Sequence, residues 1–251
     1  MDQDPNPVAP QSPRSARLSP ERARAWAAAA GTGVAGTRLS SLDTSVMQDL
    51  LRFDRIGGPG PGLEALEVVA AALRHGRSLC MVLEHESREV VLTVFPNHKL
   101  VHCPLPADGW GRLHVGRLQV ERVEPARREP PAAGAKPSTH LLALEPVLWD
   151  LALNGSRSEL LPEIVGPVGY RISPAAELPG LHQRHQGATL AAAVARLRRD
   201  TSTLADIERW PGFDRERGQR LLNGLYLNAA LIVSRTHPAA SSERAAPQRA
   251  E

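Results

Sequence analysis

The chain has 251 residues, of which 42% are hydrophobic and 23% are charged, and its formal net charge is +3. This composition is near the globular average, which excludes wholesale disorder, and no apolar run reaches the roughly 18 residues that a membrane span needs. Two cysteines cannot form a disulfide scaffold. The aromatic content of 4% argues against a stacking platform for single-stranded nucleic acid.

The positive charge comes almost entirely from arginine. Of the 30 basic residues, only Lys99 and Lys136 are lysines. With the abundance of alanine, proline and glycine, this indicates a high-GC bacterial coding bias, so arginine content alone says little about ligands. A dedicated nucleic-acid-binding protein concentrates more positive charge on one face than a net +3 provides.

Both ends of the chain have little apolar surface to bury. Residues 1–41 are expected to form a disordered region that contains one short alanine-rich helix at 21–30, which Ser19-Pro20 would begin. Residues 239–251 are expected to be a disordered tail. The first twenty residues lack the apolar segment of a signal peptide, so the cytoplasm is the expected localisation.

A first folded module is predicted at 42–124. Its two helices are expected at 42–53 and 63–74, on either side of a glycine- and proline-rich loop at 57–62. An antiparallel sheet is expected to pack on these helices, with interruptions of its last strand at Gly116 and near Arg122. The predicted strands are 78–83, 90–95, 100–103 and 113–123.

Residues 125–138, rich in proline, alanine and arginine, are expected to link this module to a second one at 139–238. The second module is predicted to be mostly helical and to end in a helix-turn-helix. Its predicted helices are 140–153, 159–165, 188–199, 204–210 and 215–227, with extended pieces at 167–172 and 231–233. The fold class expected for the whole chain is therefore α+β.

The segment T-L-A-D-I-E-R-W-P-G-F-D-R-E-R-G-Q-R-L-L-N-G-L-Y-L-N-A-A-L-I-V resembles the degenerate winged-helix segment that closes some bacterial regulatory proteins, including those with PATAN-type modules. The shared pattern is a helix, a turn, a helix with paired leucines, and a strand after a small residue. With the preceding helix it covers about fifty residues and carries no catalytic motif. The resemblance implies a regulatory or adaptor role, and the β-rich first module does not share the PATAN pattern.

The third helix of this segment carries the candidate contact residues Arg215, Arg217, Gln219 and Arg220. In a DNA-reading helix-turn-helix, the N-terminal half of this helix enters the major groove, where arginine recognises guanine. Asp214 and Glu216, however, lie where phosphates would approach, and no second hairpin strand follows Val233 to complete a wing. A solvated helix face that contacts a protein partner is therefore preferred over one that contacts DNA.

Five metal-ligating side chains gather in the first module: Cys80, His85, His98, His102 and Cys103. Their spacings match no zinc pattern, and Val82 suggests that Cys80 lies on a buried strand face. We therefore expect both cysteines to be small structural hydrophobes that bind no metal. His102 and Cys103 are also not expected to form a catalytic pair, because neighbouring strand residues point to opposite faces.

Two short motifs are attributed to chance. The sequence G-T-G-V-A-G at 31–36 matches the dinucleotide-binding fingerprint, but a helix precedes it where a strand is required. Cys103-Pro104 matches a two-residue haem-responsive motif.

We therefore expect a non-enzymatic, cytoplasmic bacterial regulatory or adaptor protein with a protein partner and with no catalytic residue, cofactor, metal or membrane partner. The alternatives are a DNA-binding transcriptional regulator that uses the helix at 215–227, and an unrecognised enzyme whose triad is hidden in the sequence.

Overall fold

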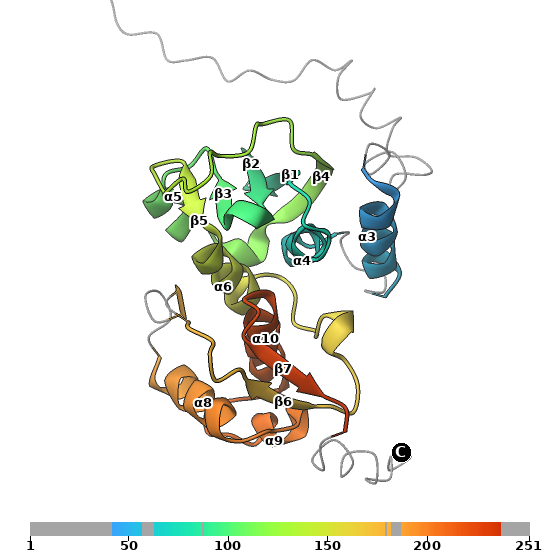
Figure 1. Cartoon of the computed structure of the whole chain (residues 1–251), viewed down its shortest axis with the longest axis vertical. Helices are drawn as coiled ribbons and strands as arrows, with labels where there is room; N and C mark the ends of the chain where they lie inside the picture. Colours follow the sequence, from blue (N-terminus) through green and yellow to red (C-terminus); the bar gives the residue numbers. More distant parts are fainter. Residues whose placement is uncertain (1–41, 57–62, 87, 179, 182–186, 237–251) are drawn as a thin grey trace, which may run out of the picture. The chain divides into compact units, whose positions relative to one another are not determined.

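The computed structural model of the chain describes residues 42–56, 63–86, 88–178, 180–181 and 187–236. All of them belong to one compact unit, Arg38–Glu251. Figure 1 draws the described residues in colour. Three predicted segments lie outside them: the helix at 21–30, the loop at 57–62 and the tail at 239–251.

Five strands form one antiparallel sheet in the order β4-β1-β2-β3-β5. They are β1 (Leu79–His85), β2 (Arg88–Phe95), β3 (Leu100–His102), β4 (Gln119–Pro125) and β5 (Leu141–Ala143). This confirms the predicted α+β class with its small antiparallel sheet. Strand β5 was not predicted, because three residues are too few for a strand alternation to be recognised.

The strand interruptions predicted at Gly116 and Arg122 have two different structures. Residues Val115–Arg117 form a 3-10 turn, η2, so β4 begins only at Gln119. In the pairing with β1, Val82 faces Arg122 while Leu83 faces Val120, so β4 carries one extra residue between these pairs. The interruption near Arg122 is therefore a β-bulge.

The buried face of β1 is the one opposite to that expected from the sequence. Leu79, Met81 and Leu83 are almost completely buried, whereas Cys80 is only half-buried. The expectation that Cys80 lies on the core face with Val82 was wrong. Val82 misled the assignment because it is itself buried, at 7% exposure, on the second face of the sheet.

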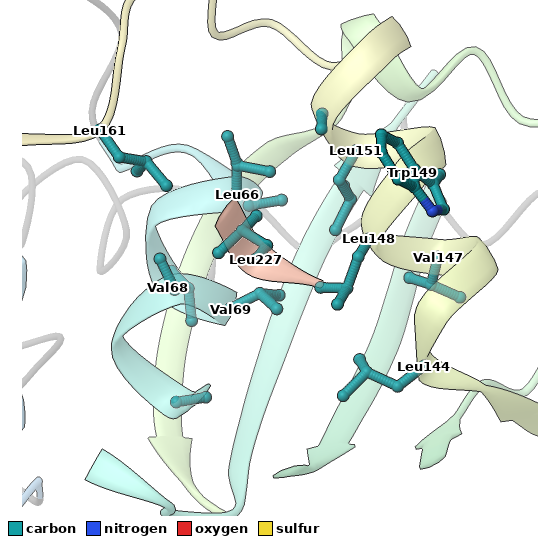
Figure 2. Close-up of a cluster of buried hydrophobic side chains, with 14 of the residues drawn as sticks. Leu66, Val68, Val69, Leu144, Val147, Leu148, Trp149, Leu151, Leu161 and Leu227 are labelled. Carbon is teal, nitrogen blue, oxygen red and sulfur yellow. The ribbon is translucent and has the colours of Figure 1, made fainter. Parts of the chain in front are cut away.

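Helices α4 (Ala65–His75) and α6 (Leu144–Asn154) pack against the sheet and against each other. Figure 2 shows how Leu66 of α4, Leu148 and Leu151 of α6, and Leu227 from the C-terminal part of the chain gather in one apolar cluster. Helix α3 (Thr44–Ile56) packs on α4. A short helix, α5 (Ala107–Gly111), brings the buried Trp110 indole to Asp150, with an Nε1–Oδ2 distance of 2.9 Å.

A buried arginine joins α4 to the chain that follows α6. The Arg157 guanidinium donates to the Glu67 carboxylate. It also donates to the backbone carbonyls of Glu159 and Leu160, both at 3.0 Å. Because these acceptors replace water around a side chain that is only 7% exposed, the buried charge is compensated.

The C-terminal half contains α8 (Ala188–Arg199), α9 (Leu204–Glu208), α10 (Arg215–Leu227), β6 (Gly169–Ile172) and β7 (Leu231–Ser234). The observed α8, α10 and β7 lie within one residue of the ranges predicted. At 159–165 the predicted helix is wrong: only the 3-10 turn η3 (Pro162–Ile164) forms. Pro167 follows closely and keeps the residue before it out of the helical region.

Strands β6 and β7 pair antiparallel, and β6 also bridges to Ser202 through two backbone hydrogen bonds with Tyr170. The strand that pairs with β7 therefore comes from upstream of α8. A partner strand had been expected only after Val233, and for that reason this pairing was not predicted.

The segment 125–138 does not separate two independent cores. After it, β5 joins the sheet through β3, and α6 then packs on both the sheet and α10. One continuous hydrophobic cluster includes residues from both predicted modules. In the part of the chain that the structure describes, no helix is long and apolar enough to cross a membrane.

Candidate functional site

The segment from α9 to α10 is held by local hydrogen bonds that its sequence specifies. Thr203 and Asp206 form a capping box at the start of α9. Asp214 caps α10, with its Oδ1 accepting from the Arg217 backbone N–H at 2.7 Å. In the turn, Gly212 has φ +74, and a Cβ there would lie 2.8 Å from the side chain of Thr189. Glycine is therefore required at this position.

The four predicted contact residues do not form one free surface. Arg215 is exposed and paired with Glu208 at 2.9 Å. Arg217 is also exposed and donates to the Gly212 carbonyl at 2.6 Å, while Gln219 is half-buried. Arg220 instead donates to the Gly155 carbonyl at 2.6 Å at the end of α6, so its role is in packing. Only Arg215 and Arg217 remain strong candidates for a contact.

Most of α10 is covered by the rest of the molecule. Gly224 lies so close to α6 that a Cβ there would be 2.4 Å from Cζ3 of Trp149. Asn223 is fully buried: its side chain accepts from the Leu161 N–H at 2.9 Å and donates to the Glu159 carbonyl at 2.8 Å. Gly218 packs against Ile207 on α9. Only the first turn of α10 is exposed.

A second group of polar side chains lies where α3, α4, η3 and α10 meet. Arg74 of α4 donates to the carboxylates of Asp49 on α3 and Glu163 in η3. His75 contacts Asp49 with a nitrogen–oxygen distance of 2.7 Å. Tyr226 of α10 lies near Arg74 and Glu163. We call these five residues the polar junction.

The charges of the polar junction shift two pKa values. Burial opposes ionisation of Asp49, but the hydrogen bonds from His75 and Arg74 outweigh it and lower the pKa of the carboxyl below its ordinary value. Burial and the nearby Glu163 carboxylate raise the pKa of the Tyr226 phenol, while Arg74 acts in the opposite direction.

An aspartate bonded to a histidine resembles the orienting half of a catalytic triad. Asp49, however, is shared with Arg74, and among the described residues no serine, threonine or cysteine side chain bonds to His75. The junction therefore holds no activated nucleophile of the triad type in the described part of the chain.

The two cysteines have different environments. Cys103 is fully buried, and burial raises the pKa of its thiol, with a backbone hydrogen bond from Leu105 acting against the shift. Cys80 on β1 and His102 on β3 pair with Thr93 from opposite sides, so strand β2 lies between them. Burial lowers the pKa of His102, and the positive charge of Arg128 adds to this. Both cysteines are free thiols.

The five metal-ligating residues singled out in the sequence do not converge. Across the described residues, one group of three or more potential ligands comes together, and it contains His85, Glu86 and His114. His85 therefore lies with Glu86 and His114 and is not grouped with either cysteine. Glu86 and His114 were missed because His114 is far from the other two in sequence, and only the pairing of β4 with β1 brings it near.

The glycine motif at 31–36 lies outside the described residues. No protein-family model matches the chain, and comparisons with curated proteins and with solved structures found no match either. Inferences about function therefore rest on the residues and geometry of this chain alone.

Proposed function

We propose that this protein is a non-enzymatic regulatory or adaptor protein that acts through contact with another protein. The observation that carries the proposal is the covering of α10 by α6 and by residues 157–161. A helix that reads DNA must present its outer face to the major groove. Here only the first turn of α10 is exposed, so the face that it could present to a groove is short.

The charges around the exposed first turn also favour a protein partner. Arg215 is neutralised by Glu208, and Asp214 and Glu216 lie beside Arg215 and Arg217. Phosphate binding would need unpaired cations at this place. A protein surface with mixed charges suits this turn better.

DNA binding by the first turn is the alternative, because Arg215 and Arg217 are exposed there. Gel-shift titration of the full chain with a mixed-sequence duplex at low salt tests it. We expect no shift for the wild-type protein. A gel shift of the wild-type protein that is lost in the double variant Arg215→Glu/Arg217→Glu would establish DNA binding through this turn and overturn the proposal.

Protein contact is tested in the native cells by a photo-crosslinking residue placed at position 217. A matched control carries the same residue at Arg122, which is exposed on β4. We expect a protease-sensitive, nuclease-resistant adduct at position 217 that is absent at position 122 and weakened by Arg215→Glu. Equal labelling at both positions, or none at 217, would contradict a contact through this turn.

A further inference from the structure

His85, Glu86 and His114 each offer one ligand atom, and these three atoms lie within 4.8 Å of one another. His85 ends β1, Glu86 follows it, and His114 precedes the turn η2. We propose that these residues form a binding site for a divalent transition metal, with zinc as the preferred ion. This inference is independent of the proposed function of the helix-turn-helix.

The chemistry of the donors selects the class of metal. Imidazole nitrogen suits zinc, copper, iron and nickel, whereas calcium and magnesium prefer all-oxygen sites. Two histidines and one glutamate are also the protein ligands of a common type of zinc site, in which a fourth position is left for water or for a further ligand. The same arrangement at this site would leave one position open.

The limit of 4.8 Å on the separation of the three ligand atoms is wider than the separation in a loaded site. Tetrahedral zinc with bonds of about 2.1 Å places its ligand atoms roughly 3.4 Å apart. Glu86 and His114 are exposed, so their side chains can rotate to close this difference. The described partner of the Glu86 carboxylate is Arg117, in an exposed ion pair with a nitrogen–oxygen distance of 3.7 Å. A pair this long and exposed offers little resistance to metal binding.

The His85 ring provides a second, independent observation. Its Nε2 atom is buried and has no hydrogen-bond partner. Buried polar atoms in folded proteins are normally satisfied by protein, water or an ion. The ring of His85 is also stacked on that of His114, with the centroids 6.3 Å apart and the planes within 5° of parallel. The two histidines are therefore already side by side.

The turn next to His114 is packed against the rest of the molecule. A Cβ on Gly116 would lie 2.9 Å from the Asn154 carbonyl oxygen, so the turn that carries His114 lies directly against the end of α6. Glu86 has φ +50, a left-handed conformation that is unfavourable for a residue with a side chain. A bound ion would join the end of β1 to the segment before β4.

The first experiment is a calorimetric titration of the metal-stripped full chain with zinc, using a buffer that does not bind zinc. We expect saturable binding of one zinc ion per chain. The melting temperature should rise by about 5 °C at a zinc concentration a hundredfold above the dissociation constant. Absence of saturable binding below about 0.1 mM zinc would overturn the proposal.

Single variants assign the ligands. His114→Ala and Glu86→Gln change exposed side chains, and each should weaken zinc binding at least about tenfold without lowering the melting temperature of the zinc-free protein. The matched control is His140→Ala, which removes an exposed histidine that directly precedes β5. Unchanged binding in His114→Ala, or an equal loss in His140→Ala, would place the metal elsewhere.

Cobalt as a spectroscopic substitute tests the ligand type. Coordination by His85, His114 and Glu86 should give visible d–d bands without the intense thiolate-to-cobalt charge-transfer band. The double variant Cys80→Ser/Cys103→Ser should give the same spectrum and the same stoichiometry. A thiolate band, or loss of the metal in this double variant, would show that the cysteines are the ligands and would overturn the assignment.

Discussion

Cys103 and Cys80 illustrate how burial sets the chemistry of single residues in this protein. Cys103 is fully buried and has a raised thiol pKa, whereas Cys80 is half-buried on the other face of the sheet. Because the thiolate is the reactive form, Cys103 should be inert in the folded protein. With a disulfide reagent, we expect one fast equivalent that Cys80→Ser removes, and a second only on unfolding. Two fast equivalents in the folded protein would refute this assignment.

Asp49 makes a pH-dependent contribution to stability. Its pKa in the folded protein lies below the ordinary value of 3.8, so its contribution is complete above that value and is lost as the pH falls toward the folded pKa. Asp49→Asn should cost about 1–2 kcal/mol near neutral pH, because a charged hydrogen-bond acceptor is removed at a partly exposed place.

Urea unfolding of the wild-type and Asp49→Asn proteins between about pH 3 and pH 7 measures this dependence. The difference in free energy of unfolding should shrink as the pH falls below about 4. Asp43→Asn is the matched control, because the Asp43–Arg77 pair is exposed and should contribute little. A difference that stays constant with pH would show that Asp49 does not act through its charge.

At the scale of elements, the apolar face of α10 contributes more to the stability of the protein than its charged residues do. Leu222 is fully buried, as are Leu221 and Leu225. Leu222→Ala should lower the free energy of unfolding by about 2–5 kcal/mol, because it removes a buried side chain and leaves a cavity. Arg215→Glu/Arg217→Glu is the control and should change it by less than about 1 kcal/mol, since both charges are exposed. Chemical denaturation measures the free energy of unfolding of both variants. Equal losses in the two variants would show that the charges matter as much as the apolar face.

At the scale of the whole molecule, the region from α3 to β7 should unfold as one cooperative unit. Arg157 joins α4 to the segment after α6, and Asn223 and Gly224 join α10 to that segment and to α6. Denaturant-dependent hydrogen exchange of peptides covering 79–95 and 215–227 should report the same global free energy. Arg157→Ala should lower both values together, because it removes the cation that the buried Glu67 carboxylate binds. Protection lost in one peptide well before the other would indicate two independent modules.

Local signals in the sequence specify α9, the turn that follows it and α10. These signals are the capping side chains at Thr203 and Asp214, the glycine of the turn and the leucine spacing of 215–227. Each depends only on residues a few positions apart, so α9 and α10 could be located from the sequence alone. The longer strands β1 and β2 were equally visible, because their apolar residues extend over seven or eight positions. The same signals gave the α+β class.

Only the tertiary structure decided what depends on residues far apart in the chain. Pairing between distant segments forms β5 and sets which face of β1 is buried. Packing between distant segments covers α10 with α6 and brings His114 close to His85. Short strands and single histidines carry no periodic signal, and the register that brings them together is set by the whole core. For that reason the sequence located the arginines of α10, whereas the fold showed that most of that helix is covered and that three potential metal ligands meet at the end of β1.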